Sequence, residues 1–208
     1  MAKNSMKLAL FASAVALGVA CAVPAQEGPA PKLVSGASAR MLSEACVGCH
    51  GTDGASGGPA SPSIGGMNGE YFVELMKGYK SDEVFGTIMN RIAKGYSDEE
   101  IALMGTFFAG QKFVPAKQKF DDGQVAAGLK LHDKYCEKCH SEGGKILEEE
   151  EYYILSGQWT PYLKNAMADF LEKRREMPKK MKSKVEKMME KEGEKGLDAL
   201  FAYYASQQ

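Results

Sequence analysis

The stretch Cys46-Val47-Gly48-Cys49-His50 has the same pattern as Cys136-Glu137-Lys138-Cys139-His140, which follows 90 positions later. In such a Cys-x-x-Cys-His box, the two thiols add across the vinyl groups of a haem and the histidine ligates the iron. Cysteine pairs with this spacing also occur in zinc sites and in thioredoxin-type redox sites. Because a histidine follows both pairs directly, we favour the haem interpretation. The sequence predicts two covalently bound haem c groups, attached by Cys46, Cys49, Cys136 and Cys139 and ligated by His50 and His140.

The first 25 residues have the pattern of a secretory signal peptide. Two lysines precede a 13-residue apolar run from Leu8 to Ala20, and Val23-Pro24-Ala25 precedes the first acidic residue. The run is too short for a membrane-spanning helix, which needs about 20 apolar residues. We expect cleavage after Ala25, which removes Cys21, and export to the periplasm. A lipoprotein in which Cys21 is acylated and retained is the alternative.

The predicted mature chain is mildly acidic. Two of the 26 Lys and Arg residues of the full chain lie in the leader, which leaves 24 basic against 27 acidic residues and a net charge of about −3. This balance argues against nucleic acid as a partner. The four remaining cysteines all lie in the boxes, so none is left for a structural disulfide. No later stretch approaches the length of a membrane span.

Helical periodicity surrounds the first box. Apolar residues recur at helical spacing from near Ser38 to Cys46, over Tyr71–Tyr79 and over Val84–Ile92. A capping box at Ser97-Asp98-Glu99-Glu100 predicts the start of a further helix.

The second half repeats this order. An apolar pattern leads into Cys136, a stripe covers Tyr162–Phe170, and Pro178 stands at a plausible helix start. Ile64-Gly65-Gly66 aligns with Leu155-Ser156-Gly157 at an offset of 91, close to the separation of the boxes, which indicates an internal duplication. The charged run from Glu172 to Lys195 fits a solvated helical face.

These patterns predict an all-α fold of two tandem cytochrome c-type helical domains, each wrapped around one covalent haem. The predicted boundaries are a signal peptide over 1–25, a first domain over 26–112, a linker over 113–122 and a second domain over 123–208.

The third histidine is an unsuitable sixth ligand for either iron. His132 lies one helical turn before Cys136 and therefore on the proximal side of the second haem. We interpret His132 as structural. With three histidines in the chain, two haems with histidine on both sides are excluded.

Methionine is the expected sixth ligand. Met89 and Met181 lie at matching positions, 39 and 41 residues after the box histidines. We predict that they ligate the irons, which gives six-coordinate electron carriers because a thioether favours Fe(II) and raises the potential. Met177 is a rival for the second site. Met76 and Met167 also match each other, but packing accounts for them.

A ligating histidine needs a partner for its other ring nitrogen. For His50 we expect the backbone carbonyl of Pro59 or of a residue beside it. The segment after His140, including the acidic run from Glu148 to Glu151, contains no proline. We therefore expect the two haem environments to differ.

Longer strings around the boxes resemble the two-haem cytochrome subunit of the flavocytochrome c sulfide dehydrogenases. The strings are Gly58–Ile64, Arg91–Ser97, Leu131–His140, Gly157–Leu163 and Asp198–Gln208. The resemblance implies a periplasmic heterodimer in which a flavoprotein subunit with covalent FAD oxidises sulfide. It also implies that the cytochrome subunit passes the electrons to a small soluble cytochrome. This chain has no Gly-x-Gly-x-x-Gly after a strand pattern, so flavin binding and sulfide chemistry would belong to the partner.

Two other functions remain open on the sequence. The duplicated box alone equally supports a free two-haem electron shuttle of a respiratory or photosynthetic chain. A two-haem peroxidase would need an open iron site, and the matched methionines Met89 and Met181 argue against it.

Overall fold

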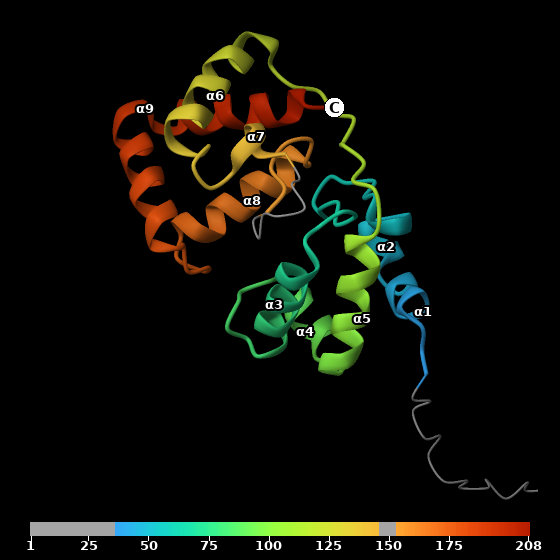
Figure 1. Ribbon diagram of the computed structural model, residues 1–208. Helices are drawn as coiled ribbons and strands as arrows, with labels where there is room; N and C mark the ends of the chain where they lie inside the picture. The colour runs from blue at the N-terminus through green and yellow to red at the C-terminus, as the bar shows by residue number, and fades with distance from the viewer. Residues whose placement is uncertain (1–35, 146–152) are drawn as a thin grey trace, which may run out of the picture. The chain divides into compact units, whose positions relative to one another are not determined.

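The computed structural model describes residues 36–145 and 153–208 (Figure 1). Gly36–Gln208 forms one compact unit. The predicted signal peptide, the first ten residues of the predicted first domain and the run from Glu148 to Glu151 lie outside the described residues. In the described ranges all regular secondary structure is helical and no strand occurs, which confirms the predicted all-α fold.

The helices of the first half are α1 (Ala39–Glu44), α2 (Val47–His50), the 3-10 turn η1 (Thr52–Gly54), α3 (Gly69–Lys80), α4 (Met89–Ala93) and α5 (Asp98–Ala109). Helices α1, α3 and α5 begin close to the positions that the sequence predicts. The Ser38 hydroxyl caps α1 by accepting the N–H of Met41. The Ser97 hydroxyl accepts the N–H of Glu100, whose carboxylate accepts the N–H of Ser97, so the predicted capping box is present.

The helix predicted over Val84–Ile92 is shorter than expected. Only Met89–Ala93 is helical, and the residues before it form a loop. The Asn90 side chain holds this loop, because its amide donates to the carbonyls of Tyr79 and Val84 and its oxygen accepts the N–H of Gly86. These bonds satisfy backbone groups that a longer helix would otherwise use.

The helices of the second half are α6 (Asp122–Tyr135), α7 (Ser141–Gly144), α8 (Thr160–Leu171) and α9 (Lys179–Ser206). Pro178 is the N-cap of α9, as predicted. Helix α9 changes direction at Gly193, whose φ of 61° and ψ of −155° interrupt the helical conformation. The two directions of α9 are visible in Figure 1.

Hydrogen bonds in the two halves confirm the internal duplication. The Gly54 carbonyl accepts the N–H groups of Ile64 and Gly65, at 2.8 and 3.2 Å. In the second half the Gly144 carbonyl accepts from Leu155 and Ser156, at 3.1 and 2.9 Å. The N–H groups of Gly66 and Gly157 then each bond to the last long helix of their own half, through the carbonyls of Phe108 and Tyr204. Equivalent residues therefore occupy equivalent loops.

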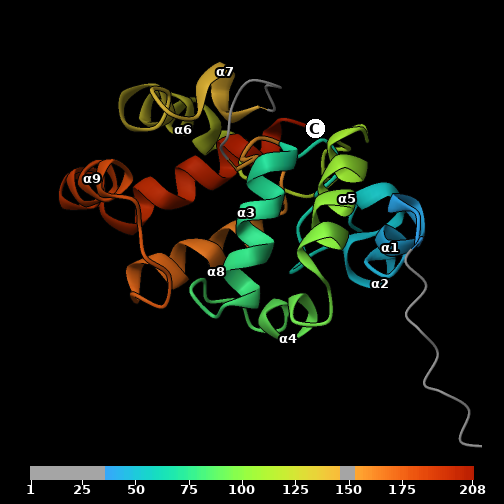
Figure 2. The same cartoon turned by 60° about the horizontal axis from the view of Figure 1, so that its bottom comes forward.

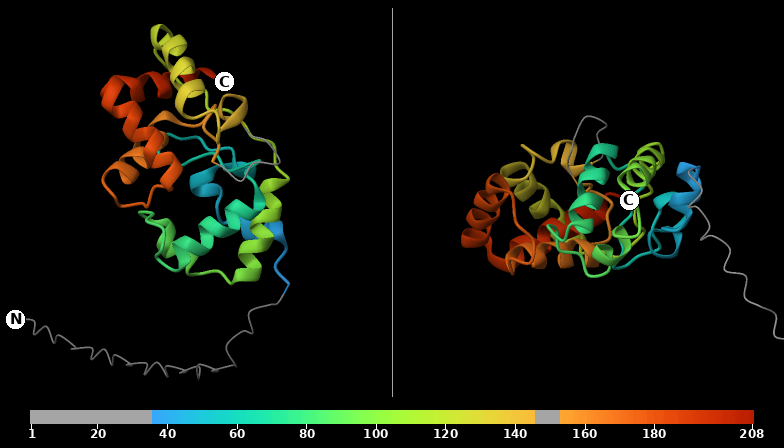
Figure 3. Two further views of the ribbon diagram at one scale, coloured as in Figure 1. Left: turned by 60° about the vertical axis from the view of Figure 1, so that its left-hand side comes forward. Right: turned by 90° about the horizontal axis from the view of Figure 1, so that it is seen from below.

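Each half packs around its own apolar cluster. In the first half, α3 lies against α5 (Figure 2) and buries Phe72, Met76, Ile101, Met104 and Phe108. In the second half, α6 lies across α9 (Figure 3), and the cluster contains Leu163, Met188, Leu197, Leu200, Phe201, Tyr203 and Tyr204.

The crossing of α6 and α9 requires a glycine. A Cβ atom at Gly128 would lie 2.0 Å from the carbonyl oxygen of Ala199. Because only glycine permits such a close backbone approach, Gly128 sets how near α9 comes to the helix that ends in the second box.

Candidate haem-binding sites

The first box forms a single helical turn. Cys46 is the N-cap of α2, and its carbonyl accepts the N–H groups of Cys49 and His50 at 3.2 and 2.9 Å. Residues three and four apart share one side of a helical turn, so both thiols and the imidazole project from the same side. Neither cysteine is in a disulfide. Burial raises the pKa of the Cys46 thiol.

The His50 ring is oriented by a backbone carbonyl. Its Nδ1 lies 2.9 Å from the oxygen of Pro62. A carbonyl can only accept, so Nδ1 carries the proton and Nε2 keeps the lone pair that iron requires. Burial lowers the pKa of His50 although the bond to Pro62 opposes this shift. The lowered pKa favours the neutral ring, which is the form that binds metals.

The acceptor for His50 differs from the predicted Pro59. The loop between η1 and α3 closes on itself, because the Ser56 hydroxyl donates to the carbonyl of Ser61 at 2.8 Å. This closure brings the carbonyl of Pro62, three residues after Pro59, to the imidazole. The sequence predicted the right loop and the right chemical group but the wrong residue.

The second box begins at the C-terminus of α6. Cys136 is the C-cap of that helix, and its N–H donates to the carbonyl of His132 at 2.7 Å. The Cys136 carbonyl in turn accepts the N–H groups of Cys139 and His140, at 3.1 and 3.0 Å. This repeats the hydrogen-bond pattern of the first box. Burial raises the pKa of the Cys136 thiol.

His132 is structural, as predicted. Its side chain is fully buried, with Nδ1 2.9 Å from the hydroxyl of Tyr204 and Nε2 2.6 Å from the carboxylate of Glu137. The same carboxylate accepts the N–H groups of Glu142 and Gly143. His132 therefore ties α6 to α9 and to the segment that follows His140.

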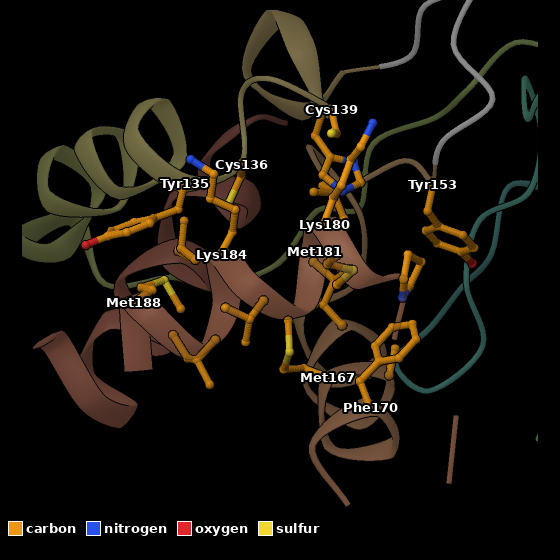
Figure 4. A pocket seen from close by; sticks show the side chains of 18 of the residues that line it. Tyr135, Cys136, Cys139, Tyr153, Met167, Phe170, Lys180, Met181, Lys184 and Met188 are labelled. Atoms are coloured by element: carbon orange, nitrogen blue, oxygen red, sulfur yellow. The ribbon is translucent and has the colours of Figure 1, made fainter. Parts of the chain in front are cut away.

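The second box opens onto a cavity of about 1080 Å³. Cys136, Cys139 and His140 line it on one side, and apolar residues of α8 and α9 line it elsewhere. Figure 4 shows Met167, Met181 and Met188 around the same cavity as the two cysteines. A large, mainly apolar cavity with two free thiols and one imidazole at its wall fits a covalently attached haem.

The structure separates the two candidate ligands of the second half. Met181 lines the cavity, whereas Met177 is not among its lining residues. Met188 also lines the cavity, but it is 2% exposed and packs in the core of the second half. Sequence reasoning missed Met188 because the residue at the matching position of the first half is Asp98. Met167, predicted to pack, also borders the cavity.

In the first half, Met89 and Met76 occupy different surroundings. Met89 is the first residue of α4, is half-buried and packs against the edge of the core. Met76 is 5% exposed within that core, which agrees with a packing role.

Tyrosines and one arginine join the halves beside the cavity. Arg175 donates through Nε to the carbonyl of Phe85 at 2.9 Å, and its guanidinium lies 2.5 Å from the hydroxyl of Tyr79. Burial raises the pKa of Tyr79 to about 12, against the opposing effect of Arg175. The rings of Tyr153 and Tyr162 stack at a centroid distance of 5.6 Å, and both residues line the cavity. Tyr153 and Tyr162, together with Tyr71 of the first half, thus border the cavity.

The described residues contain neither a cluster of metal-ligating side chains nor a membrane-spanning helix. No group of three or more His, Cys, Asp and Glu side chains in 36–145 and 153–208 is arranged to hold a metal ion. None of the helices in these ranges is both long enough and apolar enough to cross a membrane.

Comparisons with known proteins identify relatives that are named as cytochromes. The cytochrome subunit of sulfide dehydrogenase from Chlorobaculum tepidum is 42% identical over 91 residues, which cover 44% of this chain and 81% of that protein. Cytochrome c4 from Pseudomonas aeruginosa is 26% identical over 146 residues, which cover 65% of this chain and 71% of that protein. No protein-family model matches the chain.

The fold also matches a solved cytochrome. The crystal structure of reduced recombinant cytochrome c4 from Pseudomonas stutzeri superposes with a TM-score of 0.66 at 22% identity, and the match covers 83% of this chain and 100% of that one. This likeness shows that the two helical halves together have the fold of that cytochrome. The chain belongs to the family of c-type cytochromes that includes the cytochrome subunit of sulfide dehydrogenase.

Proposed function

We propose that this electron-transfer cytochrome is the two-haem subunit of a sulfide-oxidising complex. It would accept electrons from a flavoprotein subunit, which carries FAD and oxidises sulfide, and pass them to a small soluble cytochrome. The observation that carries this proposal is the 42% identity to a protein named as the cytochrome subunit of sulfide dehydrogenase.

The residues that would hold the two haems are those of the boxes and two methionines. Cys46 and Cys49 would attach the first haem, with His50 and Met89 as the iron ligands. Cys136 and Cys139 would attach the second haem, with His140 and Met181 as the iron ligands. Support for the second set comes from the cavity, which Cys136, Cys139, His140 and Met181 all line.

Bound haem c supplies reversible one-electron exchange at its iron. The chain itself would orient the iron-ligating side chains and exclude water from the haem sites. Pro62 holds the His50 ring in the tautomer that leaves Nε2 as a donor to metal. Apolar side chains from α8 and α9, including Leu163 and Phe201, line the cavity beside the second box and lower its dielectric constant. An apolar surrounding and a thioether ligand both favour the ferrous form and so raise the potential.

The partner would carry the sulfide chemistry, and this chain would have no catalytic site of its own. The proposed organisation is a signal peptide over 1–25, domains over 26–112 and 123–208, and a linker over 113–122. Export by the signal peptide would place the complex in the periplasm.

The test is to purify the chain from its natural host without denaturant and to measure gel-filtration mass together with the ratio of haem to flavin. We expect two haems per flavin, in a particle well above the mass of this chain. Two haems without flavin at the mass of the monomer would contradict the proposal, and the chain would then be a free electron shuttle.

A further inference from the structure

The loop that orients His50 is held by the other half of the molecule. Gln158 follows directly after the second-half loop of Leu155-Ser156-Gly157, and its side chain is fully buried. Its Oε1 accepts the N–H of Ser63 at 2.9 Å, and its Nε2 donates to the carbonyl of Ser63 at 2.9 Å. The side-chain amide thus pairs with both backbone groups of one first-half residue.

One peptide group connects this pair to the histidine. The carbonyl of Pro62 and the N–H of Ser63 belong to the same peptide unit, which is planar. His50 Nδ1 donates to the carbonyl end, and Gln158 Oε1 accepts from the N–H end. The direction of the carbonyl therefore depends on the bond that Gln158 makes. Hydrogen bonds in such a chain also polarise one another, so an acceptor on the N–H makes the carbonyl a stronger acceptor.

The neighbouring tryptophan holds the start of the same loop. Trp159 Nε1 donates to the carbonyl of Ser56 at 3.1 Å, and its ring fills the space that a Cβ at Gly58 would occupy. The loop is fixed by the second half at Ser56 and at Ser63, with Pro62 between them.

We propose that Gln158 is a positioning residue for His50, through which the second half sets the redox potential of the first haem. The inference rests on the proposed role of His50 as an iron ligand. A strong bond from Nδ1–H to a carbonyl makes the imidazole a better electron donor, which stabilises the ferric form. Loss of the Gln158 bond should therefore weaken that donation and favour the reduced first haem, while the second haem, whose box lies in the other half, keeps its potential.

The test compares the haem-loaded full-length protein with its Gln158→Met variant, which keeps the volume of the side chain and removes both bonds to Ser63. Loss of an outer hydrogen bond to a ligating histidine typically changes metal affinity or activity about 10- to 100-fold. Gln158 acts one bond further out, so we expect a smaller effect. At a fixed applied potential, the ratio of reduced to oxidised first haem should rise about threefold or more, as measured by spectroelectrochemical titration. In proton NMR, the His50 Nδ1–H signal should move and that of His140 should not.

Gln118→Met is the matched control. The Gln118 side chain bonds to the carbonyl of Gln158 and to the N–H of Thr160, both in the second half. It should leave both haem potentials unchanged. Gln158→Asn, which shortens the amide by one methylene, serves if the Met variant does not fold, and should shift the first haem in the same direction.

Three results would overturn the inference. Unchanged potentials and an unmoved His50 signal in the Gln158 variants would show that the second half does not tune this ligand. Equal shifts in both haems would show a general loss of structure. A wild-type protein that carries no haem at the first box would overturn the proposed function itself, and the inference with it.

Discussion

Met181 and Met177 lie only four residues apart, yet only Met181 borders the cavity next to the second box. A thioether bound to ferric haem produces a weak charge-transfer band near the red end of the visible spectrum. We propose Met181 as the second-half ligand because it lines the same cavity as His140. Met188 and Met167 are the rivals of Met181, because both border the same cavity.

We predict that Met181→Ala removes the part of this band that comes from the second haem and that Met89→Ala removes the rest. The measurement is the optical spectrum of the oxidised protein. Met177→Ala is the control and should leave the band intact. If Met188→Ala removes the band and Met181→Ala does not, the assignment of Met181 is wrong.

His132 offers a second test at the level of single residues. Substitution of His132 by Leu would leave the buried hydroxyl of Tyr204 without this bond and would release the carboxylate of Glu137. We expect the free energy of unfolding to fall by about 2 kcal/mol, which is typical for the loss of a buried hydrogen-bond partner. Denaturant titration of the haem-loaded protein measures it.

Lys130→Ala, on an exposed position of the same helix, should stay within about 0.5 kcal/mol of wild type. If His132→Leu is as stable as this control, His132 does not hold α6 against α9.

At the level of helices, local patterns predicted starts better than extents. Ser38, Ser97 and Pro178 each stand where a helix begins. The hydroxyls of Ser38 and Ser97 accept N–H groups three residues further on, so the signal for these two starts is local. The apolar stripe over Val84–Ile92 predicted too long a helix. The Asn90 side chain instead bonds to the backbone as far back as Tyr79. The spacing of apolar residues cannot predict such side-chain hydrogen bonds.

The contact between α6 and α9 yields a prediction for this level. At Gly128, even a methyl group would overlap the carbonyl of Ala199, so Gly128→Ala must push the two helices apart. We expect a loss of about 3 kcal/mol or more in the free energy of unfolding, as for an overpacked core. Thermal or denaturant unfolding of the haem-loaded protein measures it.

Ala127→Ser, at the exposed neighbouring position, should change stability by no more than about 0.5 kcal/mol. An equal effect of both variants would mean that α6 and α9 do not cross at Gly128.

For the whole molecule, the sequence predicted the duplication but not the contacts between the two halves. The boxes and the Ile64 and Leu155 loops repeat at nearly constant spacing, so they predicted two similar domains. Gln158 and Arg175 contact residues about 90 positions away, and nothing in their local sequence marks them. The choice of Pro62 over Pro59 escaped prediction for a related reason, since loop closure through Ser56 decides it.

Arg175 allows a test of the contacts between the two halves. Its guanidinium donates to the Phe85 carbonyl and contacts Tyr79 across the two halves. Arg175→Met should lower the free energy of unfolding by about 2 kcal/mol, because hydrogen bonds to a charged group are worth about 1.5 to 3 kcal/mol. It should also speed proteolytic cleavage in the segment 113–122. Both effects are measured on the haem-loaded protein.

Lys164→Met is the control, because Lys164 pairs with Asp198 on the exposed surface of the second half alone. This variant should change the free energy of unfolding by no more than about 1 kcal/mol and should leave the cleavage rate unchanged. Cleavage of Arg175→Met at the wild-type rate would contradict a role for Arg175 in joining the halves.

The central claim, that one exported chain carries a haem in each of its two domains, is tested most directly by the intact mass of the protein secreted from a host that attaches haem c. We predict the mass of the polypeptide from Gln26 to Gln208 plus two haem groups. With Cys136→Ala and Cys139→Ala together, the covalent mass should fall to one haem. A wild-type mass with one haem or none would contradict the account.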